Sequence, residues 1–153
     1  MTEVKPRLGT TFQGIFGSVV AELRAARVPT VTQTEVADHM GLAVSTWSRI
    51  ERGESALTLE QMVRIATFFG VPLSKLLQEC ETRLKGLQDQ GVTVALSRDT
   101  LNETIGLVSL SSAQIKLIVG ASALIPGLGP ILGTAAAAAF LAYRSLKDVD
   151  KGK

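Results

Sequence analysis

Charged residues are distributed very unevenly along this chain, and no other feature limits its possible folds as strongly. The sequence carries 16 basic and 14 acidic side chains in 153 residues, yet Lys116 is the only charged residue between Ile105 and Tyr143. A segment this apolar must be covered by protein or lipid, because a monomer rarely exposes so large an apolar surface to water. We therefore expect two unlike parts: a charged N-terminal domain and an apolar C-terminal element that requires a partner.

The composition excludes several classes of protein. One cysteine allows no intramolecular disulfide and no Cys-x-x-Cys pair, and one histidine allows no histidine-rich metal cluster. Residues Met1 to Leu8 mix charges with Pro6 and lack the apolar stretch of a signal peptide. The sequence also shows no paired carboxylates, no Cys–His arrangement and no glycine loop that holds phosphate before a helix. We expect a cytoplasmic, nucleoid-associated protein that is not an enzyme and needs no cofactor and no metal.

Helix signals follow one another closely up to residue 90. Two capping boxes, Thr32-Gln33-Thr34-Glu35 and Thr58-Leu59-Glu60-Gln61, mark helix starts, because the first and fourth side chains satisfy each other's backbone N–H groups. Glycines stand where a left-handed residue can end a helix: Gly41, Gly53 and Gly70. The spacing predicts one helix before Pro29, three between the first capping box and Gly70, and a fifth from Pro72 to about Leu87.

The second and third of these helices are joined by a short corner at Gly41. This is the helix-turn-helix layout, in which the second helix of the pair lies in the major groove of DNA. Residues 12–77 also resemble the Xre/Cro group of phage-repressor-like DNA-binding domains. The matching residues are Thr32-Gln33-x-Glu35-Val36-Ala37-x-x-Met40-Gly41-Leu42, Ser45-Thr46-Trp47-Ser48-Arg49-Ile50-Glu51-Arg52-Gly53 and Leu59-x-x-Met62-x-x-Ile65-Ala66-x-x-Phe69-Gly70-Val71. The resemblance implies a five-helix domain whose third helix reads double-stranded DNA.

The same resemblance implies a set of DNA contacts. Gln33, at the start of the second helix, would contact phosphate or base. The candidates for base contact are Val44, Ser45, Thr46, Ser48 and Arg49. The candidates for phosphate contact, which positions a protein without selecting a sequence, are Arg24, Arg27 and Arg52. Arg49 has the chemistry for a bidentate contact to guanine. The alternative for Arg24, Arg27 and Arg49 is that each is an ordinary solvated charge on a helix surface.

One residue of this domain departs from the pattern of the group, and three others are expected to be structural or exposed. Ala43 stands where many members of that group have a Ser or Thr N-cap, which costs the third helix about 1 kcal/mol. Trp47 and Cys80 are expected in the core, and His39 on an exposed helix surface. Residues 1–96 contain equal numbers of basic and acidic side chains. DNA binding would therefore depend on a local basic patch rather than on net charge.

The rest of the chain predicts a helical hairpin. Thr100-Leu101-Asn102-Glu103 is a third capping box, and the helix it opens can extend to Ile125. Pro126-Gly127-Leu128-Gly129-Pro130 must then be a turn, and a last helix runs from Ile131 to about Leu146. Residues 92–96 are either a short strand or an extended linker. The hairpin is either buried in a soluble homo-oligomer or inserted in a membrane, for which its second arm is short.

The predicted fold is all-α: a five-helix repressor-like helix-turn-helix domain followed by a hydrophobic C-terminal helical hairpin. The predicted parts are an N-terminal tail (1–11), the helix-turn-helix domain with an extended fifth helix (12–90), a linker (91–99), the hairpin (100–147) and a C-terminal tail (148–153). The predicted function is sequence-specific transcriptional regulation: a repressor bound to an inverted-repeat operator as a homodimer or larger oligomer. The alternative is a membrane-associated or partner-capturing protein of antitoxin or phage-immunity type with a DNA-binding head.

Overall fold

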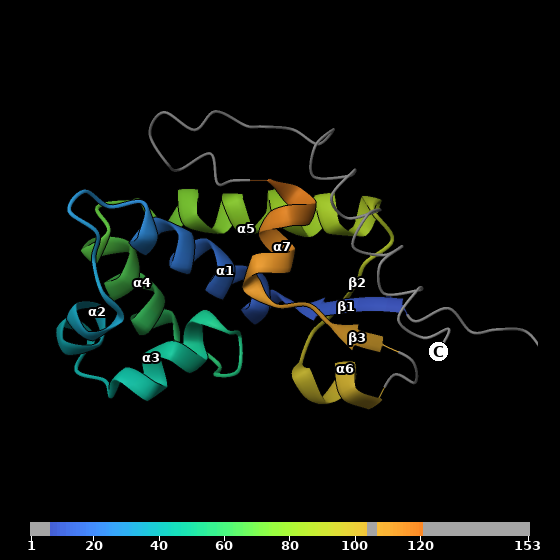
Figure 1. Cartoon of the computed structure of the whole chain (residues 1–153), viewed down its shortest axis with the longest axis horizontal. Helices are drawn as coiled ribbons and strands as arrows, with labels where there is room; N and C mark the ends of the chain where they lie inside the picture. Colours follow the sequence, from blue (N-terminus) through green and yellow to red (C-terminus); the bar gives the residue numbers. More distant parts are fainter. Residues whose placement is uncertain (1–6, 104–106, 121–153) are drawn as a thin grey trace, which may run out of the picture.

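The computed structural model describes residues 7–103 and 107–120. Within these ranges the chain forms seven helices and three short strands, and a body of helices adjoins a small sheet (Figure 1). In chain order the elements are β1 (Arg7–Thr11), α1 (Phe12–Ala25), α2 (Gln33–Met40), α3 (Val44–Glu51), α4 (Leu59–Phe68), α5 (Leu73–Asp89), β2 (Thr93–Ala95), α6 (Arg98–Glu103), β3 (Leu107–Ser109) and α7 (Ser112–Val119).

The boundaries of α2, α3 and α4 follow the signals in the sequence. Thr32 and Thr58 begin α2 and α4 with complete capping boxes, which confirms both predicted starts. Gly41 adopts a left-handed φ of 66° directly after α2, a conformation that glycine reaches without steric cost. Ala43 provides α3 with no side-chain cap, as the sequence predicts.

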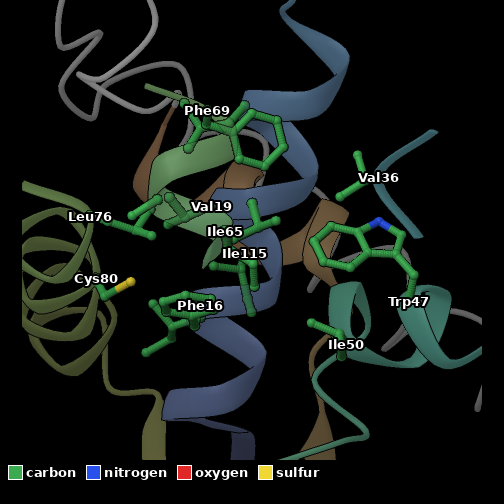
Figure 2. Packing of buried hydrophobic residues seen from close by; sticks show 14 of the residues in the cluster. Phe16, Val19, Val36, Trp47, Ile50, Ile65, Phe69, Leu76, Cys80 and Ile115 are labelled. Carbon is green, nitrogen blue, oxygen red and sulfur yellow. The ribbon is translucent and has the colours of Figure 1, made fainter. Parts of the chain in front are cut away.

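The core surrounds α1, which contacts α3 on one side and α5 on the other. Figure 2 shows Phe16 of α1 among buried side chains of α4, α5 and α7, with Trp47 and Ile50 of α3 closing the cluster. Trp47 and Cys80 are fully buried, so both core predictions are confirmed. Burial raises the pKa of the Cys80 thiol to about 12, which leaves it uncharged and unreactive at neutral pH. His39 is exposed, also as predicted.

The described residues are mostly helical, as predicted, but they are not all-α, because they also form a parallel three-stranded sheet. β1 is the central strand, with β2 paired along one edge and β3 along the other. Residues 7–11, predicted as part of a tail, are therefore the middle of the sheet. Of the two alternatives given for residues 92–96, the structure has the short strand, at residues 93–95. The strands are only five, three and three residues long and are far apart in sequence. No local alternation of apolar and polar residues indicates β1 or β3.

The continuous helix predicted from Thr100 to Ile125 is also wrong. α6 begins earlier, at Arg98, and the Ser97 hydroxyl accepts a hydrogen bond from the Thr100 N–H at 3.2 Å. The chain then forms β3 before a new helix, α7, begins with a capping box of Ser111 and Gln114. The residues Ser111-Ser112-Ala113-Gln114 were the signal for this second start, because they repeat the pattern that begins α2 and α4.

Only the first part of the predicted hairpin lies within the residues that the structure describes. The turn predicted at residues 126–130 and the arm predicted at 131–146 lie outside the described residues. In the ranges that are described, no helix combines the length and apolar character needed to cross a membrane. α7 packs on α1 and α5, with Ile115 and Ile118 buried in the common core. Within the described residues, the first predicted arm thus contains the end of α6, the strand β3 and the short core helix α7.

A buried ion cluster joins α1 to α5. Arg83, which is 2% exposed, donates hydrogen bonds to both carboxylate oxygens of Glu22 at 2.9 and 2.8 Å. It also donates to Glu79 and to the Ser18 hydroxyl, each at 3.1 Å. Removing one partner of such a cluster leaves a buried charge uncompensated, which is costly. The cluster therefore holds α5, and the strand β2 that follows it, in a fixed position on α1.

Candidate nucleic-acid interface

The helix α3 has one buried and one outward face. Trp47, Ile50 and Glu51 point into the protein, whereas Val44, Ser45 and Arg49 are exposed and Thr46 and Ser48 are half-buried. Ser45 and Arg49 are four residues apart and so share one face of the helix. The structure therefore brings the predicted base-contact residues together on a single exposed helix, immediately after the corner at Gly41.

One carboxylate beneath this face joins α1, α2 and α3. Glu51 is 5% exposed. Its Oε1 accepts hydrogen bonds from Arg24 Nε at 2.6 Å and from Trp47 Nε1 at 2.7 Å. Its Oε2 accepts from Gln33 Nε2 at 2.6 Å and from Arg24 Nη2 at 3.1 Å. Because Gln33 begins α2 and Glu51 ends α3, this Glu51 network (Glu51, Arg24, Gln33 and Trp47) fixes the two helices of the motif relative to each other.

The network gives Arg24 and Gln33 structural partners. Both were predicted to contact DNA from their positions in the motif. Arg24 also donates to the Val31 carbonyl at 3.2 Å, and its side chain is only 19% exposed. Any contact of either side chain with DNA stays a prediction. The sequence did not single out Glu51, although its spacing of four residues from Trp47 places the indole N–H next to a carboxylate on one helix face.

Arg27 is tied to a different part of the domain. Its guanidinium donates to the carbonyl oxygen of Phe69 and lies over the ring of that residue, 5.6 Å from the ring centre. This contact joins the end of α1 to the end of α4. The phosphate contact of Arg27 stays a prediction.

Arg52 follows the last residue of α3 and remains accessible. Its Nη1 donates to the Ser48 hydroxyl at 2.7 Å, and its Nε and Nη2 donate to the two carboxylate oxygens of Glu54 at 3.1 Å each. The hydrogen bond from Arg52 is the main reason that the pKa of Glu54 is lowered. With the Arg52 side chain 55% exposed, solvent screens this ion pair and makes it weak. The guanidinium can therefore exchange Glu54 for another anion.

Two close approaches set the position of α3 on the rest of the protein. A Cβ atom at Gly17 of α1 would lie 2.6 Å from the carbonyl oxygen of Glu51, so only glycine lets α1 approach the end of α3 this closely. On the same carbonyl, the Ser112 hydroxyl of α7 donates a hydrogen bond at 2.7 Å. The last turn of α3 is thus held by α1 and by α7.

Comparison with known proteins agrees with this geometry. Residues 23–76 match the helix-turn-helix family, a range that begins in α1, ends in α5 and contains all four members of the Glu51 network. This part of the chain is a helix-turn-helix domain. The predicted resemblance is confirmed over that range.

A curated relative gives more detail over a similar length. A stretch of 70 residues is 33% identical to the cryptic phage CTXphi transcriptional repressor RstR of Vibrio cholerae, and it covers 46% of this chain and 61% of that protein. The chain therefore spans less than two thirds of the length of this relative. No solved structure matches the chain.

Proposed function

We propose that the protein is a sequence-specific DNA-binding transcriptional regulator, a repressor, which inserts α3 into the major groove. The observation that carries the proposal is the exposed face of α3, which includes Arg49 in its last turn and is held in place by the buried Glu51 network. A helix of eight residues on a rigid support is suited to this task, because base contacts require side chains fixed to within a fraction of an ångström. The helix-turn-helix match and the repressor relative support it.

The proposed roles follow from the chemistry of each side chain. Arg49 makes a bidentate contact to guanine, Val44 and Thr46 contact thymine methyl groups, and Ser45 bonds a base or a phosphate. Arg52 contacts phosphate once it leaves Glu54. Because Ala43 supplies no cap, the backbone N–H groups of the first turn of α3 are available to a phosphate oxygen, which suits the positive end of a helix.

We further propose that the regulator acts as a homodimer or larger oligomer on an inverted repeat. Two recognition helices would then occupy successive major grooves about 34 Å apart. The apolar residues of the C-terminal segment 100–147 are the proposed oligomerisation element, and residues after Gly120 carry most of them. A protein with this role acts in the cytoplasm at the nucleoid.

The experiment that tests the proposed function compares Arg49→Ala with the unaltered protein on two duplexes. One duplex carries the region upstream of the protein's own gene and the other a scrambled sequence of equal length, and binding is followed by fluorescence anisotropy. Loss of a bidentate base contact is expected to weaken binding to the upstream region by roughly 10- to 100-fold. Binding to the scrambled duplex should change little.

Lys85→Gln is the matched control, since Lys85 is exposed on α5, and α1 lies between α5 and α3 (Figure 1). This variant should bind both duplexes as the unaltered protein does. Equal weakening on both duplexes by Arg49→Ala would contradict a base contact. Absence of DNA binding by the unaltered protein would contradict the proposed function itself.

A further inference from the structure

A group of arginines gathers at the end of α3, and one of its members lies outside the helix-turn-helix domain. The Glu54 carboxylate is bonded to Arg52 at 3.1 Å and lies 3.8 Å from the guanidinium of Arg98, and the charge of Arg49 also acts on it. Arg98 is the first residue of α6, beyond the matched range of residues 23–76. Two guanidinium groups therefore lie against one carboxylate, with the charge of Arg49 also acting on it, and this arginine cluster (Arg49, Arg52 and Arg98 with Glu54) keeps a net positive charge.

The cluster is open to solvent. The side chains of Arg52 and Arg98 are 55% and 47% exposed, and Glu54 is 30% exposed. All three line one cavity of about 280 Å³. They consequently face a common space into which another anion can enter, and neither ion pair is buried enough to resist exchange.

The position of Arg98 relative to α3 is fixed by packing. Leu101 of α6 is 3% exposed, and α6 contacts β1, the strand that continues directly into α1. α1 in turn contacts α3 through Gly17. Arg98 is therefore attached to the recognition helix through the sheet and α1, as well as through Glu54.

We propose that Arg98 contacts the DNA backbone beside Arg52, so that the DNA-binding surface extends from the helix-turn-helix domain onto α6. This inference rests on the proposed function. In the free protein Glu54 occupies the two guanidinium groups, and in the complex phosphate oxygens take its place. A phosphate accepts the same paired hydrogen bonds from arginine as a carboxylate does. The contact carries no sequence information, because every nucleotide presents the same phosphate.

The test is Arg98→Gln, measured by fluorescence anisotropy on the upstream and scrambled duplexes over a range of salt concentrations. Losing one phosphate contact reduces the slope of log affinity against log salt by about one. Binding to both duplexes should weaken by roughly tenfold at about 50 mM salt and by roughly threefold at about 200 mM. The ratio between the two duplexes should not change. Lys85→Gln is again the control for loss of a distant positive charge.

Glu54→Gln separates a direct contact from an indirect one. Removing this carboxylate should tighten binding to both duplexes, because a negative charge beside the phosphates is lost. In the Glu54→Gln background, Arg98→Gln should still lower the salt slope by about one. If its effect disappears in that background, Arg98 acts only by holding Glu54 and the proposal is wrong.

The remaining outcomes distinguish this inference from the proposed function. If the unaltered protein binds the upstream duplex and Arg49→Ala weakens that binding, but Arg98→Gln leaves both affinity and salt slope unchanged, only the extension onto α6 fails. If no duplex is bound, the proposed function fails first. Thermal unfolding of each variant checks that the fold is retained, and an exposed pair at 3.8 Å should contribute little to it.

Discussion

At the scale of single residues, two buried carboxylate–guanidinium groups among the described residues have different positions and consequences. The Arg83 cluster joins α1 to α5 far from α3, so it contributes to the fold alone. The Glu51 network lies directly beneath the recognition surface and includes the indole N–H of Trp47. A change at Glu51 should therefore alter both stability and the position of α3, whereas a change at an exposed carboxylate should alter neither by much.

Glu51→Ala is expected to lower the free energy of unfolding by about 2 to 4 kcal/mol. The reason is that the Trp47 N–H loses its acceptor in the core and Arg24, which is largely buried, loses its counter-charge. Urea unfolding measures the change. Because Trp47 is the only tryptophan of the chain, its fluorescence should also shift to longer wavelength in the folded variant.

The matched control for that substitution is Glu54→Ala, which removes a carboxylate three residues later whose side chain is 30% exposed. It should cost less than about 1 kcal/mol and leave the Trp47 spectrum unchanged. Equal urea midpoints for the two variants would show that the Glu51 network does not stabilise the domain.

At the scale of elements, the sequence predicts helix starts that depend on neighbouring residues, and it predicts poorly the elements that depend on residues distant in sequence. The starts of α2 and α4 could be read from their capping boxes, because both partners of each box lie within four residues. β1 and β3 could not, and β2 only as one of two alternatives, since each is stabilised by backbone pairing with a strand that is distant in sequence. The outward face of α3 was predicted from the motif. Arg98 was not, because only the tertiary fold brings α6 next to the end of α3.

The close contact between α1 and α3 gives a prediction at this scale. Gly17→Ala places a methyl group against the carbonyl groups of Ile50 and Glu51, which are backbone atoms that cannot rotate away. Overpacking of this kind is expected to lower the free energy of unfolding by about 1 to 3 kcal/mol. It should also weaken DNA binding, because α3 must move. Urea unfolding and anisotropy on the upstream duplex measure the two effects.

Gly86→Ala, on α5, is the matched control because the same methyl group is added inside a helix. There the nearest atom is a side-chain carbon of Val119 at 3.2 Å, which can shift. The gain of up to about 1 kcal/mol in helix propensity should offset this crowding. If Gly17→Ala is as well tolerated as Gly86→Ala, the close approach of the two helices does not fix α3.

At the scale of the whole molecule, the described residues already form a closed core. α7 completes it by placing Ile115 among side chains from α1 and α5, and Ser112 holds the end of α3. The apolar residues between Ile105 and Val119 are thus partly accounted for within one chain. The charge distribution predicts that a partner covers the apolar segment, and this prediction now concerns mainly the residues that follow Gly120. No charged residue lies between Lys116 and Arg144.

The proposed homo-oligomer can therefore be tested by ending the chain at Gly120. The shortened protein retains α7 and the core, so we expect it to fold and to be a monomer in light scattering after size-exclusion chromatography. The complete chain, of 16.2 kDa, should elute in detergent-free buffer at a whole-number multiple of its mass. The shortened form should bind an inverted repeat more weakly at equal chain concentration. The reason is that binding of one helix-turn-helix domain no longer holds a second domain close to the other half-site. If the unshortened chain is monomeric in this buffer, the proposed oligomer is wrong. If the unshortened chain is recovered only with membranes or detergent, a membrane-inserted C-terminal segment is favoured.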